Sequence, residues 1–402
     1  MFLAKRRRWT VLAVSAAITG VLVASARAEE QVAKPEPPRI QMAILLDTSN
    51  SMDGLINQAR TQLWKIVNEF TSAKLGGEVP ILEVGLYEYG NDGLPAEGGH
   101  LRMVVPLTSD LDKVSEALFG LTTNGGYEFC GKVIDVAIRE LEWSTAGRDL
   151  KCIFIAGNEE FTQGDVDYKE ACKAAAAKGV TVSTIFCGDH EQGVQTKWQH
   201  GAQLADGSYM SVDQQRAVAS IATPQDKDLA QLSDALSKTY VPYGEEEQRK
   251  KFSQRQGQQD ANAAKAAAGA AASRAGFKAS ILYRNSAWDL VDALEDGKVK
   301  LEDLKAEMLP EVMRTMSLDE RKAYVAKVAA ERKQVQEKIR KLGEDRTTYL
   351  AEQHEKLRVE AAAAAAEAGP GAVPAAPAPA SVDEAIIDAV REQAAERGFK
   401  LD

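Results

Sequence analysis

Asp47, Ser49 and Ser51 place one carboxylate and two hydroxyls at alternating positions of a short segment. The segment directly follows the apolar run 40–46, which is expected to be a buried strand. Hard oxygen donors of this kind are the ligands that Mg²⁺, Mn²⁺ and Ca²⁺ take in proteins. Because the segment supplies a single carboxylate, an ion held there could still recruit an acidic group from a partner. A simpler alternative is that Ser51 caps a helix beginning at Met52.

The remaining sequence contains no pattern typical of a catalytic site. Its four histidines lie at positions 100, 190, 200 and 354, and none has a recognisable nucleophile or metal pattern around it. There is no glycine-rich phosphate loop and no G-x-S-x-G motif. We therefore expect that the protein is not an enzyme and that it binds no organic cofactor.

The first 28 residues resemble an export signal. A basic stretch, Lys5–Arg8, precedes a short apolar core, Val11–Ala24, and the small-x-small sequence Ala26–Ala28. The apolar run is short for a membrane span, although an uncleaved anchor is the alternative. We expect cleavage, no stable membrane span afterwards, and a periplasmic or extracellular location.

The net charge argues against two classes of partner. The whole chain carries a formal charge of −10, and removal of residues 1–28 would leave −15. Nucleic acid and anionic lipid attract basic surfaces, so neither is an expected partner. An acidic chain remains compatible with metal binding and with a protein partner.

Short apolar runs alternate with amphipathic helical patterns between residues 39 and 243. This alternation predicts an α/β fold, a doubly wound, mostly parallel six-stranded sheet with helices on both faces. The third strand follows a Gly-Asn-Asp-Gly turn and is expected to be an antiparallel edge. The predicted strands are 40–46, 81–89, 101–107, 150–156, 180–186 and 208–212. The predicted helices are 52–71, 111–121, 131–141, 166–178, 195–204 and 227–238.

The second half of the chain predicts helices without strands. We divide the chain into a signal peptide (1–28), a polar leader (29–38), the α/β domain (39–243), a polar link or helix (244–275), a helical region (276–368), a Pro/Ala linker (369–380) and a C-terminal helix (381–402). A three–four apolar spacing from Val325 to Tyr349 includes Arg332 and Arg346. It predicts either one helix of a small bundle or an intermolecular coiled coil.

The sheet pattern and the first loop together resemble the von Willebrand factor type A domain, over about residues 39–243. The resemblance implies a metal-ion-dependent adhesion site, where a cation bridges the domain to an acidic group of a ligand. It also implies that Asp47, Ser49 and Ser51 are ligands of that cation. Mg²⁺ is the first expectation, with Mn²⁺ or Ca²⁺ as alternatives.

Two other loops depart from the family pattern. The second loop has Tyr127 after its Gly-Gly turn, where the family has threonine, and the third loop has Gly157 where the family has aspartate. Glu128 and Glu159 are the substitute ligands that we predict, with Thr122, Thr123 and Asn158 as further oxygen donors. The extra carboxylates would hold a cation tightly but leave less positive field for a partner's carboxylate. The alternative is that the first loop holds structure by hydrogen bonds alone.

All four cysteines lie between residues 130 and 187. Export implies an oxidising compartment, so one or two disulfides are expected, and four cysteines allow three pairings. The predicted topology puts Cys130 and Cys187 at the same end of the sheet, which makes them the candidate pair. Cys152 could simply belong to the core.

The sequence leads to two functional expectations. The first is an exported binding protein that engages a protein partner through a divalent-metal adhesion-type site at the carboxyl end of the sheet. The alternative is a structural or assembly factor that acts through its helical C-terminal region and has a degenerate metal site.

Overall fold

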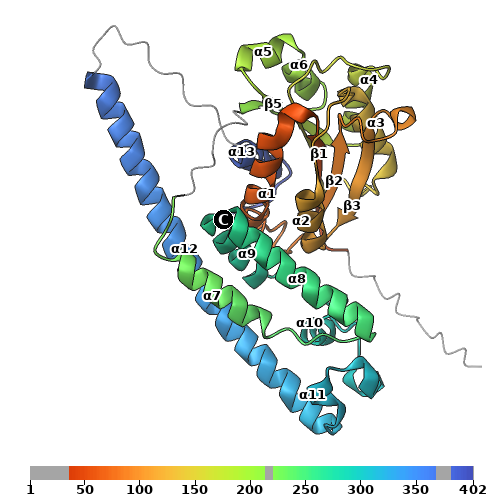
Figure 1. The fold of residues 1–402 in the computed structure, drawn as a ribbon, viewed down its shortest axis with the longest axis vertical. Helices are drawn as coiled ribbons and strands as arrows, with labels where there is room; N and C mark the ends of the chain where they lie inside the picture. Colours follow the sequence, from red (N-terminus) through yellow and green to blue (C-terminus); the bar gives the residue numbers. More distant parts are fainter. Residues whose placement is uncertain (1–35, 213–220, 368–381, 402) are drawn as a thin grey trace, which may run out of the picture. The chain divides into compact units, whose positions relative to one another are not determined.

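The fold is known from a computed structural model, which describes residues 36–212, 221–367 and 382–401. The expected signal peptide, most of the polar leader and the Pro/Ala linker lie outside these residues. A six-stranded sheet with the order β3-β2-β1-β4-β5-β6 is the centre of the described chain (Figure 1). The strands are β1 Arg39–Asp47, β2 Ile81–Tyr89, β3 Leu101–Thr108, β4 Leu150–Gly157, β5 Thr181–Cys187 and β6 Tyr209–Val212.

The sheet confirms the predicted fold class. All neighbouring strands are parallel except β2 and β3, which pair antiparallel at one edge as expected. Each predicted strand agrees with an observed one to within one residue at either end. The agreement follows from burial on both faces, since strands of a covered parallel sheet are continuous apolar runs.

Helices cover both faces of the sheet. The helices before residue 240 are α1 Asp53–Asn68, α2 Leu111–Gly120, α3 Cys130–Glu140, α4 Tyr168–Ala177, α5 His190–Gln195, α6 Trp198–Gln203 and α7 Asp226–Ser237, with the 3-10 turns η1 Asn50–Met52 and η2 Ala96–Gly98. One predicted helix, 195–204, is wrong as a single element. Lys197 has a φ of 75°, a left-handed conformation that interrupts the helix between α5 and α6.

Two apolar cores lie on the two sides of the sheet. Side chains of β1 alternate between them, with Ile44 and Leu46 on one side and Leu45 on the other. The first core contains α1, α2 and the C-terminal helix α13 Val382–Glu396, and the second contains α3, α4 and Trp198. Period-two alternation within β1 is therefore what gives the domain its three layers.

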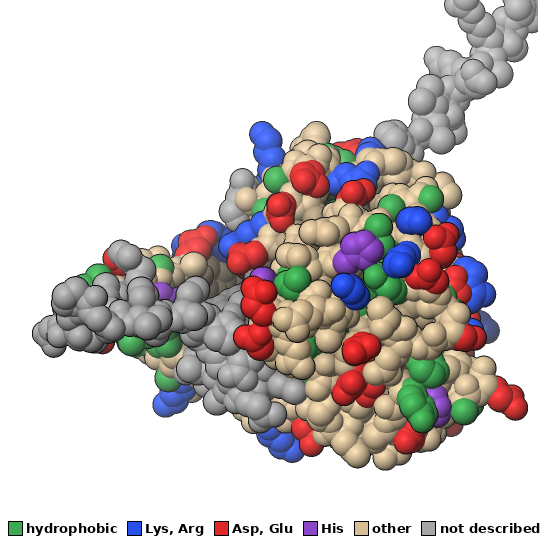
Figure 2. Space-filling view, turned by 90° about the horizontal axis from the view of Figure 1, so that it is seen from above, with side chains coloured by type: hydrophobic (Ala, Val, Ile, Leu, Met, Phe, Trp, Pro, Cys, Tyr) green, Lys and Arg blue, Asp and Glu red, His purple; other side chains and the backbone are tan. Residues whose placement is uncertain are grey.

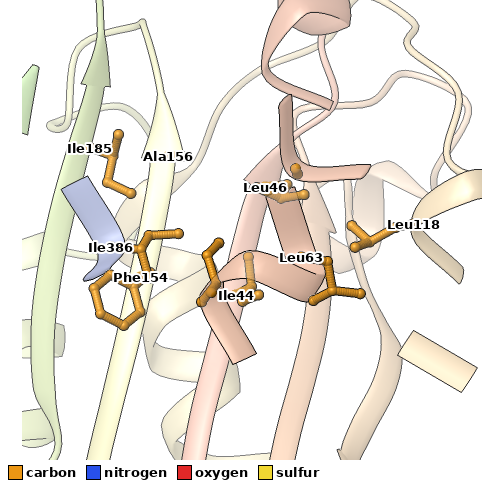
Figure 3. Close-up of a pocket in the computed structure, with 10 residues that line it drawn as sticks. Ile44, Leu46, Leu63, Leu118, Phe154, Ala156, Ile185 and Ile386 are labelled. Carbon is orange, nitrogen blue, oxygen red and sulfur yellow. The ribbon is translucent and has the colours of Figure 1, made fainter. Parts of the chain in front are cut away.

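The C-terminal helix α13 returns to the sheet. Gln393 accepts a hydrogen bond from Thr181 Oγ1 at 2.8 Å and donates one to Ser183 Oγ at 2.8 Å. The apolar side of this helix is buried, with Ile386 2% exposed. Figure 3 shows Ile386 beside Ile44 and other side chains of the first core, around an apolar cavity of about 10 Å³. This volume is close to the minimum for one water molecule and too small for a ligand.

The rest of the helical region packs against the domain and against itself. Its elements are α8 Glu246–Ala266, α9 Ala268–Ala279, α10 Leu290–Glu295, η3 Leu301–Asp303, η4 Ala306–Met308, α11 Glu311–Arg314 and α12 Leu318–Glu367. Figure 1 shows α12 alongside α7, and α9 lies against α1. The predicted helical region, 276–368, is not helical throughout. Turns and the 3-10 segments η3 and η4 occupy 280–289 and 296–310, and a turn at 315–317 separates α11 from α12.

The apolar stripe of α12 is occupied within the chain. Val335, Ile339 and Leu342 pack with α7 and α9. The two arginines of the stripe also have internal partners: Arg332 pairs with Asp289 at 2.7 Å, and Arg346 pairs with Asp226 at 2.8 Å. The bundle alternative therefore describes this stripe. Among the described residues, no helix is long and apolar enough to cross a membrane.

The predicted disulfide between Cys130 and Cys187 is wrong, because all four cysteines are free and buried. Cys130 belongs to the core beneath α3 and α4, whereas Cys187 belongs to the core on the α1 side. The sheet itself separates the two sulfurs. Cys152 lies on the side of Cys187 and Cys172 on the side of Cys130, and burial raises the pKa of the Cys152 and Cys172 thiols to about 12.

Candidate functional site

The first loop begins where β1 ends. Asp47 is fully buried, and its Oδ1 accepts a hydrogen bond from the backbone N–H of Ser49 at 2.7 Å. The hydroxyls of Ser49 and Ser51 are 3.2 Å apart. Ser51 makes no side-chain cap to the helix that follows, so the capping alternative does not explain it. The structure thus brings together the three residues that the sequence predicted.

One oxygen of Asp47 is left without a hydrogen bond. Among the residues that the structure describes, no group donates to Asp47 Oδ2, although this atom is buried. Burial raises the pKa of Asp47 to about 8, the hydrogen bonds from Ser49 oppose the shift, and Glu128 adds to it. A buried carboxylate without a counter-charge is costly, and such groups occur often at binding and catalytic sites.

Glu128 of the second loop lies beside Asp47. A Cβ atom at Gly90, which has a φ of 75°, would be 2.8 Å from Asp47 Oδ1 and 2.9 Å from Glu128 Cγ. Glycine is therefore required at the end of β2, where the backbone passes between the two acidic side chains. Glu128 is 6% exposed, and burial together with Glu159 raises its pKa to about 7. This predicted residue does face the first loop.

The third loop contributes an amide more directly than a carboxylate. Asn158 Nδ2 donates to Ser51 Oγ at 3.1 Å, so the Asn158 alternative reaches the site. Glu159 is exposed and lies farther out, where its charge raises the pKa values of Asp47 and Glu128. The sequence prediction put Glu159 among the ligands, and the structure places it at the rim.

Tyr89 explains why glycine stands at position 157. A Cβ at Gly157 would be 2.6 Å from Tyr89 Oη and 3.1 Å from Asp47 Oδ2, so the tyrosine fills the space that a third-loop aspartate would need. Its hydroxyl donates to the carbonyl of Ala156 at 3.0 Å. Sequence reasoning missed Tyr89. The available signal was its position at the end of β2, next to Asp47 in the paired strand.

The other threonine candidates serve different purposes. Thr123 Oγ1 donates to Asp53 Oδ1 at 2.7 Å, and the carbonyl of Thr122 accepts from Asn91. These contacts fasten the second loop to α1 and to the loop after β2. In these contacts neither threonine hydroxyl lies beside Asp47, so the threonine of the family has no counterpart at this site. The oxygen donor that the second loop places beside Asp47 is Glu128.

The segment after β5 is a helix cap. Asp189 is the N-cap of α5, and its Oδ1 accepts from the backbone N–H of Gln192 in the first turn. His190 lies against Tyr209 with ring centroids 5.0 Å apart. The segment contains three consecutive side chains of types found in metal and catalytic sites, Asp189, His190 and Glu191. Its aspartate is instead used to satisfy the first turn of a helix.

The donor set fits a hard divalent cation. The orphaned Asp47 Oδ2, the two serine hydroxyls, Glu128 and the Asn158 amide oxygen are all of the type that Mg²⁺, Mn²⁺ or Ca²⁺ prefers. Within the described ranges, no three His, Cys, Asp or Glu side chains form a metal cluster by themselves. A cation here would depend on the serine hydroxyls in addition to the carboxylates.

Residues 41–223 match the von Willebrand factor type A domain family. No curated protein matches the chain. Similar solved structures include the conserved hypothetical protein BatB from Bacteroides thetaiotaomicron (21% identity, 43% of this chain and 90% of that chain, TM-score 0.33). They also include an aerotolerance-related membrane protein from Bacteroides fragilis (17%, 43% and 92%, 0.30). Proximal thread matrix protein 1 from the mussel byssus, with a zinc-occupied MIDAS motif, is a third (11%, 44% and 42%, 0.32).

The family match begins within β1, extends over the other five strands and ends before the helical region. It agrees with the strand order, the antiparallel edge and the loop after β1 described above. This chain contains a von Willebrand factor type A domain at residues 41–223, followed by a helical C-terminal region.

Proposed function

We propose that this protein is an exported, non-catalytic binding protein that engages a protein partner at the carboxyl end of its sheet, through an adhesion-type site holding a divalent cation. The observation that carries the proposal is the buried Asp47 Oδ2, which lacks a hydrogen bond and lies beside Glu128 and the two serines. Protein interaction is the usual role of this domain family, and the chain's acidity disfavours nucleic acid as the partner.

Each residue of the site has a role in the proposal. Asp47, Ser49 and Ser51 would hold the cation from the first loop, with Glu128 from the second, and Asn158 orients Ser51. The cation, Mg²⁺ in the first instance, would neutralise the paired carboxylates and fix the three loops relative to one another. Glu159 would act from the rim through its charge.

Calorimetry with the bare ions tests the site. We would titrate the protein with Mg²⁺, Mn²⁺ and Ca²⁺, beside Asp47→Ala and the control Asp228→Ala, which removes an exposed carboxylate of α7. Saturable binding is expected in the parent protein and the control, and it should be lost in Asp47→Ala. Absence of binding at about millimolar ion, a typical weak extreme for such sites, would refute the metal part of the proposal.

Export is part of the proposal and has its own measurement. The first 28 residues have the order of a signal peptide, although they lie outside the described structure. Expression in a bacterial host followed by mass analysis should give a mature protein that begins at or near Glu29, in the periplasm or the medium. A product that keeps residues 1–28 would contradict cleavage.

The alternative function, assembly through the helical region, has less support. Its strongest sequence feature was the stripe from Val325 to Tyr349, and much of this stripe contacts α7 and α9 of the same chain. If substitutions there abolished partner capture while Asp47→Ala had no effect, the assembly function would replace the one proposed.

A further inference from the structure

An exposed aromatic side chain stands at the edge of the proposed site. Tyr127 is 66% exposed, the largest fraction among the exposed large hydrophobic side chains of the described residues. Its ring stacks on Phe129, with centroids 5.9 Å apart and planes 15° apart, and lies 6.1 Å from the His100 ring. An aromatic ring that is held on two sides and open to solvent on another is typical of interface anchors.

Carboxylates lie near this aromatic cluster of Tyr127, Phe129 and His100. Asp92 is exposed, with its Oδ1 3.6 Å from His100 Nδ1. On the site side, the Gln163 side chain connects two acidic residues, because it accepts from the backbone N–H of Glu128 at 3.3 Å and donates to Glu159 Oε2 at 3.4 Å. The position after the Gly-Gly turn, Tyr127, therefore lies among acidic side chains of three loops.

Within the part of the chain that the structure describes, these carboxylates form no ion pair with a lysine or an arginine. Among the described residues, no lysine or arginine lies within ion-pair distance of Asp47, Glu128 or Glu159, and Asp92 has only His100. Figure 2, seen from above the view of Figure 1, shows acidic and basic side chains interspersed on this face, so the local ion pairs decide the charge around the site. The buried, unpartnered Asp47 Oδ2 indicates that the cluster is arranged for a bound positive group.

Charge counting separates two kinds of partner. One divalent cation neutralises Asp47 and Glu128, which leaves Glu159 and Asp92 in excess. An acidic side chain of a partner would then meet net negative charge, whereas a lysine or arginine would meet two carboxylates and an aromatic face. The observations therefore favour a basic partner over an acidic one at the rim.

We propose that the partner presents a basic segment, and that one of its lysine or arginine side chains lies on Tyr127 near Glu159 and Asp92. This proposal rests on the proposed function only in placing the partner at the carboxyl end of the sheet. It assigns to Tyr127 the role of a specificity-determining contact and to Glu159 a contact with the partner in place of direct metal ligation.

Peptide binding tests the inference on the full chain. A fluorescent tetra-arginine peptide and a tetra-aspartate peptide of equal length would be titrated with the protein in Mg²⁺, by fluorescence anisotropy. The tetra-arginine peptide should bind more tightly. Tyr127→Ala should weaken this binding roughly three- to tenfold, the range for a cation over an aromatic ring, and Tyr127→Phe should retain it.

Matched controls distinguish peptide binding at the rim of the site, around Tyr127 and Glu159, from nonspecific attraction of the peptide to an acidic protein. Ile281→Ala removes an apolar side chain that is 60% exposed on the helical region, and Glu302→Gln removes an exposed carboxylate there. Neither should alter peptide binding, whereas Glu159→Gln should weaken it and reduce its salt dependence. Equal losses in Glu159→Gln and Glu302→Gln would overturn the inference, as would tighter binding of the tetra-aspartate peptide.

The two proposals fail in different ways. If Asp47→Ala loses Mg²⁺ binding but the tetra-arginine peptide still depends on Tyr127, both stand as separate properties of this edge. If no metal binds to the parent protein and the peptide still requires Tyr127 and Glu159, only the metal part of the proposed function fails. If Mg²⁺ binds as expected and the peptide ignores Tyr127, only the basic-partner inference fails.

Discussion

Two of the regions of this protein that hold buried carboxylates treat them differently. At the junction of α2, α8 and α9, Arg274 pairs with Asp112 at 2.6 Å and with Asp260 at 2.5 Å, and Lys278 pairs with Asp260 at 2.9 Å. At the carboxyl end of the sheet, Asp47 has no ion pair with any described residue, and its Oδ2 has no hydrogen bond from them.

The difference appears directly in the pKa values. The cations Arg274 and Lys278 outweigh burial and lower the pKa of Asp260, whereas burial and neighbouring carboxylates raise that of Asp47. Both regions are buried, so burial alone does not distinguish a structural charge from a functional one. What distinguishes them is whether a side chain of opposite charge lies beside the carboxylate. This is why we place the proposed function at the carboxyl end of the sheet.

The largest expected effect comes from removing the arginine of the buried structural cluster, which consists of Asp112, Asp260, Arg274 and Lys278. Arg274→Met would leave Asp112 and Asp260 without their shared arginine, and we expect the free energy of unfolding to fall by about 3–5 kcal/mol. Urea denaturation measures this change. The control Arg340→Met, on an exposed part of α12, should change the free energy of unfolding far less, because solvent screens an exposed ion pair. Similar losses in both variants would show that the buried cluster is not special.

Asp292 is an intermediate case and gives a pH-dependent prediction. Arg332 pairs with both Asp289 and Asp292, and Arg284 lies 3.7 Å from Asp292. Burial together with Asp289 still raises the pKa of Asp292 to about 6 from an ordinary 3.8. The folded state therefore holds a proton that the unfolded state releases between these pH values. The contribution of Asp292 to stability is fully present below about pH 4 and is lost as pH rises to about 6, on the order of 2 kcal/mol.

Asp292→Asn should flatten this part of the stability profile. The measurement is the free energy of unfolding at several pH values from 4 to 7, with Asp228→Asn as a control that changes an exposed carboxylate of α7. An unchanged slope in Asp292→Asn would mean that Arg332 matches both acids fully, and Asp292 would then belong with the structural cluster.

The smallest expected effect is at the proposed site, at the carboxyl end of the sheet. Glu159 is exposed and repels Glu128 and Asp47, so Glu159→Gln should raise the free energy of unfolding by about 0.2–0.5 kcal/mol in metal-free buffer at pH 7. Thermal unfolding beside Glu302→Gln, which should show no change, measures it. A loss of stability in Glu159→Gln would mean that this carboxylate has a partner on the folded protein.

The sequence predicted the sheet well because its signals are local. Apolar runs with turn residues between them define each strand, and the loop Asp47–Ser51 follows β1 without any contribution from distant residues. Asp47, Ser49 and Ser51 could therefore be placed together before the fold was known.

What the sequence could not predict depends on neighbours in space. Cys130 and Cys187 share an end of the sheet but face opposite sides of it, and this distinction needs the orientation of each side chain. The role of Tyr89 at Gly157 depends on strand pairing in the same way. Glu128 was found because only a few oxygen donors lie in the second loop, while the outward position of Glu159 needed the loop geometry.

The return of α13 to the sheet has a consequence for the order in which the molecule can be assembled during synthesis. The contact between Gln393 and Thr181 joins residues 212 positions apart, so the sheet emerges from the ribosome long before the helix that covers part of it. Until residues 382–396 are made, Ile44, Phe154 and Ile185 lack the Ile386 side chain that packs beside them. The nascent chain therefore carries an apolar surface that only its last segment closes, and any truncation before that segment leaves this surface open to association with other chains.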